Sequence, residues 1–379
     1  MKTRNFFARL ILACVISWAF YCAVDYYAVH HWDNNESLIV RVIEAGPESI
    51  IPPEDEKEES YEMLERDTIL QVLSGTDDER VMNVKTIRLA GTGIEVVNGR
   101  RYLLVWDMFN DGRVQYSIAD AFRVPSVAGI VMAVCAILIA LTGFRGLFAL
   151  LGLGASIAVL IFTMVPLVSN GWNPVALALA SVLIIATVTV LCVVHHVRYM
   201  LVALLGSLGG AFCGFLLGSL MVWVWQLSGL SGEGAALLAS TLPGLNMRGV
   251  LLASVLIGSI GAVLDVAVSV TASMSEFVDY DNDIPLDRLL LAGLNVGGEV
   301  LGSMINTLIL AYMGSSLPMA ILICSAGVEI SGLMNDPYIA QEIVQGLAGT
   351  LGLLFTIPVT AFCFVMQESL RRRDDKSGY

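Results

Sequence analysis

Two acidic residues, Asp265 and Glu299, lie inside long apolar stretches of this sequence. An ionisable side chain at membrane depth costs free energy and is retained mostly for function or for specific packing. Small and polar residues surround Asp265 at spacings of three and four, which is one face of a helix: Ser254, Gly258, Gly261 and Ser269. Glu299 has a similar set: Asn295, Ser303, Asn306 and Thr307. Both faces are expected to pack against protein, because small residues let a second backbone approach closely.

Proton or cation coupling is the chemistry that these two carboxyls could perform. The two stretches run in opposite directions, and each carboxyl lies about nine residues from the inner end of its helix, roughly 13 Å deep at about 1.5 Å per residue. Two carboxyls at equal depth can share one proton, because both cannot carry charge side by side in a desolvated site. The alternative is that Ser, Thr or Asn side chains satisfy both carboxyls, which then only fix helix packing.

No motif for catalysis, a metal or a cofactor accompanies these residues. The sequence has no P-loop, HExxH, GxSxG or zinc-ligand spacing, so we expect no enzyme activity, no catalytic residue, no metal site and no cofactor. The seven cysteines lie in apolar stretches, where buried free thiols are expected. His195 and His196, beside Arg198, are expected at a membrane interface. The glycines of 206–214 are expected to serve helix packing.

Eight apolar runs would position these side chains. Hydrophobic residues make up 56% of the 379 residues and charged residues only 15%, too few to cover the surface of a soluble protein of this length. A spanning helix needs about 20 apolar residues. Suitable runs lie at 6–24, 126–143, 147–168, 174–195, 199–226, 249–273, 291–313 and 345–367. The first lacks a clean cleavage site and is interpreted as a span, not a signal peptide. The expected fold is an all-α polytopic membrane bundle of about eight transmembrane helices, with the lipid bilayer as partner.

The distribution of Lys and Arg between short loops sets the expected orientation. With the N-terminus inside, the inner loops and tail carry the positive charges: Arg145, Arg198, Arg288 and Arg371–Arg373. The outer loops 167–173 and 314–344 contain neither Lys nor Arg, and Arg248 is the exception. Both termini are therefore expected in the cytoplasm. The run 317–333, with Pro318 and Glu329, is short for a span and is expected to be re-entrant or interfacial.

Residues 31–123 form an expected extracytoplasmic, β-rich domain, barrel- or sandwich-like, inserted between helices 1 and 2. They hold 19 Asp/Glu against 10 Lys/Arg and so carry most of the net charge of −13. Strand-like runs lie at 38–44, 68–73, 81–88, 102–106 and 114–118, with the hairpin signals Asn98-Gly99 and Asp111-Gly112 between them. Glu54–Glu62 is expected to be a solvated loop, not a calcium site. The predicted organisation is a first transmembrane helix (1–30), this domain (31–123), a seven-helix membrane domain (124–370) and a basic cytoplasmic tail (371–379).

Two long stretches resemble the YibE/F family of bacterial polytopic membrane proteins. They are GSIGAVLDVAVSVTAS at 258–273 and GLNVGGEVLGSMINTLILAYMGSSLP at 293–318. The β-rich segment that ends at Arg123-Val124-Pro125 and the loop Asn170–Pro174 also fit, so the resemblance extends over nearly the full length. It implies a multi-pass protein in the plasma membrane of a bacterium, without defined chemistry.

A more distant likeness links the stretches around Asp265 and Glu299 to the fourth and fifth spans of RND permeases and to SecD/SecF export subunits. In those families membrane-embedded aspartates relay protons. Only Asp265 corresponds by position. It is followed by Val266, where RND permeases often carry a second aspartate, and large paired outer domains are missing. The likeness therefore does not imply a complete RND-type pump.

Two functions fit these patterns. The first is a transporter or permease for an unidentified small solute or ion, coupled to protons or cations through Asp265. The second is a non-transporting envelope factor that aids protein export, assembly or sensing through its outer β-domain. Neither involves nucleic acid. Small-residue faces beyond the central helix pair allow a homo-oligomer without requiring one.

Overall fold

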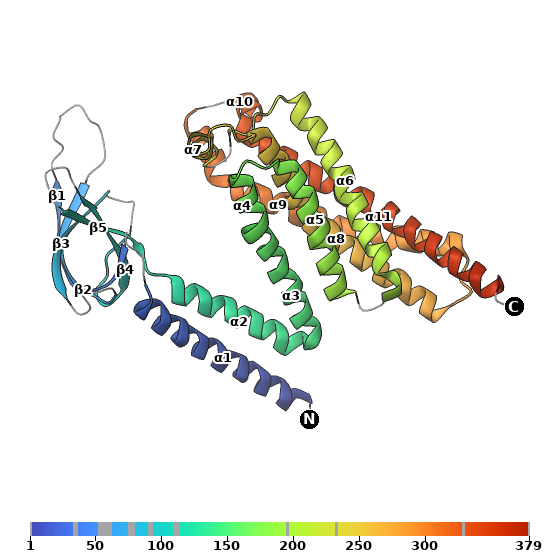
Figure 1. Cartoon of the computed structure of the whole chain (residues 1–379), viewed down its shortest axis with the longest axis horizontal. Coiled ribbons are helices and arrows are strands. Elements are labelled where there is room, and N and C mark those ends of the chain that lie inside the picture. Colours follow the sequence, from blue (N-terminus) through green and yellow to red (C-terminus); the bar gives the residue numbers. More distant parts are fainter. Residues whose placement is uncertain are drawn as a thin grey trace. The chain divides into compact units, whose positions relative to one another are not determined.

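The computed structural model describes residues 2–32, 37–51, 63–74, 80–89, 94–108, 114–194, 197–231, 234–327 and 330–377. Contacts divide the chain into two compact units, Met1–Gly146 and Leu147–Tyr379. In the described residues, eight helices are long and apolar enough to cross a membrane (Figure 1). This confirms the predicted polytopic helical class and the number of spans.

The spanning helices agree with the apolar runs, and several extend beyond them. They are α1 (Lys2–His30), α2 (Val124–Thr142), α3 (Phe144–Val159) continued by η1 (Leu160–Met164) and α4 (Val165–Ser169), α5 (Pro174–Val193), α6 (Met200–Val224), α8 (Met247–Tyr280), α9 (Leu286–Ser325) and α11 (Pro337–Ser377). Short elements η2 (Val197–Tyr199), α7 (Ala235–Thr241) and α10 (Ile330–Asn335) lie between them. The π-helical turn η1 comes directly before Pro166, which has no N–H to continue the α-helical hydrogen bonds.

Five strands between α1 and α2 form the predicted β-rich domain. They are β1 (Ser37–Ile51), β2 (Met63–Val72), β3 (Val81–Leu89), β4 (Arg101–Met108) and β5 (Val114–Ala121), paired antiparallel in the order β3-β2-β1-β4-β5. The edge strands β3 and β5 also contact each other, which closes the sheet. Register shifts at Val42/Glu44 and Ala45/Glu48 bend the long β1. This strand order and closure are those of a five-stranded OB-fold barrel, so the domain is a barrel and not a sandwich.

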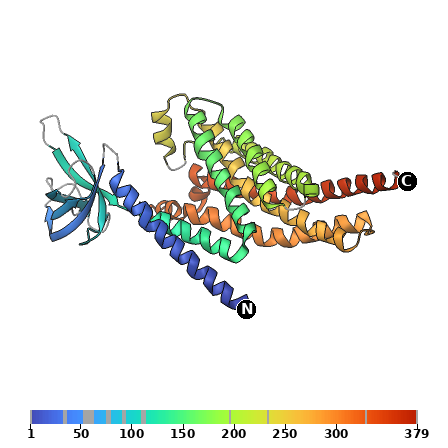
Figure 2. The ribbon, with the colours of Figure 1, turned by 60° about the horizontal axis from the view of Figure 1, so that its bottom comes forward.

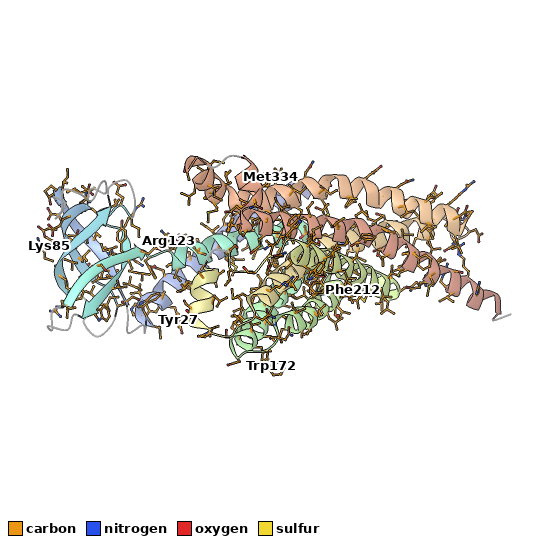
Figure 3. All side chains as sticks on the ribbon, turned by 90° about the horizontal axis from the view of Figure 1, so that it is seen from above. Tyr27, Lys85, Arg123, Trp172, Phe212 and Met334 are labelled. Atoms are coloured by element: carbon orange, nitrogen blue, oxygen red, sulfur yellow. The ribbon has the colours of Figure 1, made fainter. Side chains whose placement is uncertain are left out.

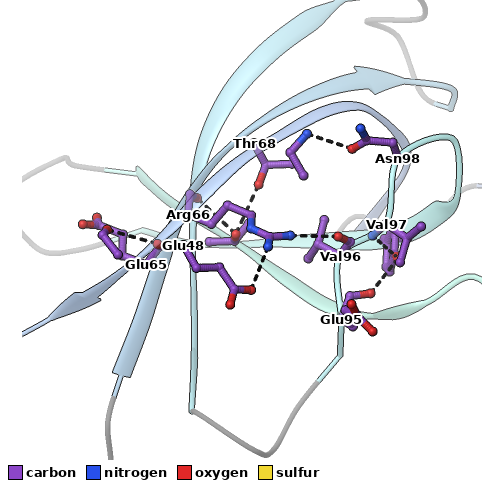
Figure 4. Close-up of polar contacts among 12 residues, drawn as sticks. Glu48, Glu65, Arg66, Thr68, Glu95, Val96, Val97 and Asn98 are labelled. Atoms are coloured by element: carbon purple, nitrogen blue, oxygen red, sulfur yellow. Dashed lines mark hydrogen bonds and ion pairs between the residues drawn. The ribbon is translucent and has the colours of Figure 1, made fainter.

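Alternation along the strands fills the barrel. On β2, Thr68, Leu70 and Val72 are buried, whereas Ile69 and Gln71 between them are half-buried and Asp67 before them is exposed. One end of the interior is polar, because the Arg66 guanidinium contacts Glu48 at 2.9 Å and donates to the Val96 carbonyl at 2.9 Å (Figure 4). These contacts join β1, β2 and the segment before β4, and they pair the charge of Arg66 and engage both of its terminal nitrogens.

The first unit also contains the helix pair α1 and α2. A Cβ added at Gly129 of α2 would lie 3.1 Å from the Cβ of Tyr21, so the two backbones approach closely. The carboxylate of Asp25 near the end of α1 forms an ion pair with Arg101 at the start of β4. The first contact joins α2 to α1, and the second joins α1 to the barrel. The chain therefore divides after α2, whereas the predicted organisation groups α2 with the six later spans.

Close packing of α6, α8 and α11 forms the centre of the second unit, and Figure 2 shows these helices side by side. The glycines of α6 that face α11 recur every four residues: Gly206, Gly210, Gly214 and Gly218. A Cβ at Gly214 would lie 2.7 Å from the carbonyl oxygen of Ala348, and one at Gly218 would lie 2.9 Å from Val255 of α8. The predicted packing role of the glycines in 206–214 is therefore confirmed.

Two expectations about the spans are wrong. Residues 317–325 prolong α9 to Ser325, with Pro318 inside the helix, so they form neither a re-entrant segment nor a ninth span; the alternative, an interfacial segment, stays a prediction. Helix continuation keeps nearly every backbone group bonded, which a re-entrant loop would not. The seven cysteines are free, but none is buried; Cys14, Cys22 and Cys324 are exposed. These three lie on the outside of apolar helices, where a thiol behaves as a small apolar group, and the other four are half-buried.

Candidate functional site

The small-polar face of α8 is packed at one end and open at the other. The Ser254 hydroxyl accepts a hydrogen bond from Gln345 Nε2 of α11 at 3.4 Å, and Gly258 lies against the Tyr312 hydroxyl of α9. Further along the helix, nothing lies within 4 Å of a Cβ added at Gly261, and Asp265 is exposed. Ser269 is half-buried. The expected packing against protein therefore holds for Ser254 and Gly258, and the segment with Asp265 is open within this unit.

The corresponding face of α9 is open along its whole polar part. Its exposed members are Asn295, Glu299, Ser303, Asn306 and Thr307. Gly298 and Gly302 lie on the same face, and a Cβ at either would meet nothing within 4 Å. Ser303 and Thr307 donate to carbonyls of their own helix, at 2.9 Å and 3.2 Å, so Thr307 does not bond across the helix pair. We call Asn295, Gly298, Glu299, Gly302, Ser303 and Asn306 the α9 polar face.

Two contacts define the antiparallel register of α8 and α9. Gly293 lies against the Met274 side chain, and Gly258 against Tyr312. Interpolation between these contacts places Asp265 and Glu299 roughly 7 Å apart along the bundle, a little over one helical turn. In the part of the chain that the structure describes, the side chains of Asp265, Glu299, Asn295 and Asn306 make no hydrogen bond or ion pair. The two carboxyls thus lie at similar depth but do not pair within one copy.

A third carboxylate, which sequence reasoning missed, is fully buried near the end of α11. Glu368 is 1% exposed, and its Oε1 accepts hydrogen bonds from Arg371 Nη2 at 2.5 Å and Arg372 Nε at 3.0 Å. Arg372 Nη1 also donates to the Ile284 carbonyl at 2.8 Å. This cluster joins α11 to the α8–α9 turn. The available signal was the spacing of Glu368 with Arg371 and Arg372, which places all three on one helix face.

A cavity of about 460 Å³ lies at the opposite end of the second unit, where α4, α5 and α8 begin or end. Trp172 lines it, together with Asn173 and Asn246 (Figure 3 labels Trp172). The Asn173 side chain caps α5 by accepting from the N–H of Val175, and Asn246 caps α8 by accepting from that of Gly249. These caps explain why asparagine occupies both positions without reference to a ligand.

Some predicted features lie outside the described residues. These are His195, His196, Glu329, Asp111-Gly112 and the whole loop Glu54–Glu62. Within the described residues, no group of three or more His, Cys, Asp and Glu side chains could hold a metal ion. Arg248, the exception to the charge bias, donates to the Val222 carbonyl at 3.3 Å, near the carboxyl end of α6. Its positive charge therefore complements the helix dipole at that end.

Eight apolar spans and a small barrel between the first two define a multi-pass membrane protein with one folded domain outside the bilayer. The family described as YibE/F-like protein matches residues 130–368. The chain belongs to this family. The match includes Asp265, the α9 polar face and Glu368, but it does not include the barrel. The sequence resemblance was expected over nearly the full length, and the family match covers residues 130–368 of it. No curated protein and no solved structure matches the chain.

Proposed function

We propose that this protein is a transporter or permease for a small solute or ion, coupled to protons or cations through Asp265. The observation that carries the proposal is an open, uncompensated carboxyl near the middle of the most buried spanning helix, α8. A charged side chain facing lipid there is costly. An acid at this position that exchanges a proton or binds a cation can alternate between charged and neutral forms, which is what coupling requires.

The second carboxyl and the amides nearby support the same proposal. Glu299 lies a little over one turn, roughly 7 Å, from Asp265 along the bundle, on the face that also carries Asn295 and Asn306. Carboxylate and amide oxygens can replace part of the hydration shell of a small cation, and amide N–H groups can bind an anionic or polar solute. The identity of the solute is left to experiment.

The orientation that we infer places both termini in the cytoplasm of a bacterial cell. The turn between α5 and α6 carries Arg198, the turn between α8 and α9 is followed by Arg288, and α11 ends with Arg371–Arg373. All three lie at the same end of the helix bundle, as the positive-inside rule requires. The barrel, which follows α1, is then outside the cell membrane.

Proton flux in vesicles tests this function. The purified protein is reconstituted with an internal pH-sensitive dye and exposed to a panel of ions and amino acids at pH values between about 5 and 8. We expect Asp265→Asn to reduce solute-dependent proton flux by about a hundredfold, because a carboxamide cannot carry the proton. Asp279→Asn, an exposed position further along α8, serves as the matched control. Equal flux by Asp265→Asn and the unchanged protein would exclude the coupling role.

A specific observation also supports the alternative function, an envelope factor that acts through its outer domain. The barrel has the OB-fold strand order, and the β2–β3 face of such barrels commonly binds extended ligands. Here that face carries Glu65 and Asp67, and the nearby Lys85 is paired with Glu65 at 3.0 Å. An acidic face disfavours nucleic acid and is compatible with a cationic or neutral partner.

A further inference from the structure

The α9 polar face has no cover within the second unit. Position by position it is exposed, from Asn295 to Asn306, over about three helical turns. The lipid-facing surface of other helices is different. The exposed face of α6, for example, carries apolar residues that suit lipid: Leu201, Leu205, Phe212, Leu216 and Leu220.

Lipid cannot cover the α9 polar face without cost. The Asn295 and Asn306 side chains each bring two donors and an acceptor, and Glu299 brings a carboxyl. In the hydrocarbon region, polar side chains of this kind associate with other helices, where they hydrogen-bond. Gly298 and Gly302 stand four residues apart with open space above them, which permits the close backbone approach of a Gly-x-x-x-Gly contact.

We propose that the α9 polar face binds the same face of a second copy of this chain, about a twofold axis along the membrane normal. In such a dimer each α9 residue meets its own counterpart at the same depth. An asparagine amide is both donor and acceptor, so Asn295 can pair with Asn295, and Asn306 with Asn306. The face is thus complementary to itself.

The serine and threonine hydroxyls of α1 and α2 are less suited to this face than the amides of a second copy. In α2 the polar side chains Ser126 and Thr142 already donate to carbonyls of their own chain segment. On α1, the Ser17 hydroxyl likewise donates to the Ala13 carbonyl. The α9 helix of a second copy carries Asn295 and Asn306 at the same depths as the α9 helix of the first.

The dimer completes the polar region around the carboxyls. It brings two Glu299 side chains to the same depth, where one proton held between them satisfies both. Such an arrangement encloses polar groups that a single copy leaves open. The inference does not depend on transport, since a non-transporting protein would need the same face covered.

Cysteine crosslinking in native membranes tests the contact. In full-length protein with its native cysteines replaced by alanine, Gly302→Cys and Asn306→Cys are oxidised with copper phenanthroline. Phe212→Cys and Leu216→Cys are matched controls, because they are exposed on apolar α6 (Phe212 is labelled in Figure 3). Contacts of α6 and α9 with α11 place these controls at nearly the depths of residues 302 and 306.

We expect disulfide-linked dimers at 302 and 306, with a yield at least about tenfold higher than at 212 and 216. Equal yields on both helices, or no dimer from α9, would overturn the proposal.

A second measurement does not depend on the cysteine-free background. Fluorescence energy transfer between labelled copies is followed as vesicles of phosphatidylethanolamine and phosphatidylglycerol are diluted with lipid. The double variant Asn295→Leu/Asn306→Leu should associate more weakly, since it loses the interhelical amide bonds. On dilution, its dimers should separate while the protein is still about tenfold denser in the membrane than the unchanged protein is at its own separation. Asn295→Gln/Asn306→Gln, which keeps donor and acceptor, should retain most of the association. Unchanged association of the leucine variant would contradict the proposed contact. Absence of solute-dependent proton flux from the unchanged protein, with intact dimers, would count against the transport function alone.

Discussion

Carboxylates in the second unit differ in whether their charge has a partner. Glu368 is buried, and the two guanidinium groups of Arg371 and Arg372 neutralise it. Asp265 and Glu299 are exposed on apolar helices without any such partner in the described residues. A buried acid with matched arginines is explained by structure alone. An unpaired acid at membrane depth requires another explanation, and this contrast supports the role proposed for Asp265, whereas ion pairing accounts for Glu368.

Removal of the Glu368 charge should destabilise the protein. We expect Glu368→Gln to lower the free energy of unfolding by about 1–3 kcal/mol, because two arginines lose their charged acceptor while the side chain keeps its size. Thermal unfolding of the detergent-solubilised protein measures the change. Glu276→Gln, at an exposed position of α8, is the control and should have little effect. A stability equal to that of the control would show that the arginines bind the Glu368 carboxylate too weakly to matter.

At the end of the barrel, the carboxylate of Asp120 should titrate below its ordinary range. Its pKa is lowered by the hydrogen bond from Arg123, at 2.6 Å, and further by the N–H of Ala121 at 2.7 Å. The resulting stabilisation is fully present above the unfolded aspartate pKa, about 3.9, and is lost as the pH falls through the lower folded value. Carboxyl carbon shifts in an NMR titration measure this. Arg123→Gln should move the pKa of Asp120 upward, and an unmoved pKa would refute the assigned cause.

Among the elements, the glycine spacing on α6 decides how the bundle packs. A side chain at Gly214 would meet the carbonyl oxygen of Ala348. A Cβ added at Gly352 of α11 would lie 3.2 Å from the Val263 side chain of α8. Each glycine therefore removes a side chain at a place where two backbones approach. The three helices hold one another at short distance, and α5 and α9 pack around them.

Filling this contact should separate the helices. Gly214→Leu is expected to destabilise the bundle by about 1–3 kcal/mol or more, because the added atoms have no space and the facing group is backbone. Gly154→Ala on α3, where nothing lies within 4 Å of the added Cβ, is the matched control and should be neutral or slightly stabilising. The melting temperature in detergent compares the two variants. Equal melting temperatures would contradict tight α6–α11 packing.

For the molecule as a whole, the two units carry separable roles in the proposed function. Deletion of residues 31–120 removes the barrel but leaves every spanning segment of the chain. If transport through Asp265 is the function, we expect this variant to insert and to retain proton flux within about tenfold of the full chain. Membrane fractionation and the vesicle assay measure both properties. Loss of function with normal insertion would instead favour an envelope factor that acts through the barrel.

Local patterns in the sequence were sufficient for the membrane class, for the spans and for the five strands, because apolar length and alternation are properties of neighbouring residues. They were insufficient for the end of α9. Pro318 and Glu329 suggested an interruption, whereas the helix continues to Ser325. They were also insufficient for Glu368, whose burial beside two arginines depends on its packing against the α8–α9 turn.

The sequence by itself determined that this protein crosses the membrane about eight times, that an acidic β-rich domain interrupts the spans, and that Asp265 and Glu299 stand at similar depth. Tertiary structure decided that β3 meets β5 to close a barrel, that Gly214 lies against α11, and that the α9 polar face stays open. The difference is physical. Hydrophobicity and periodicity are properties of neighbouring residues along the chain. Closure of the barrel, burial of side chains and pairing of charges arise between residues that are far apart in sequence.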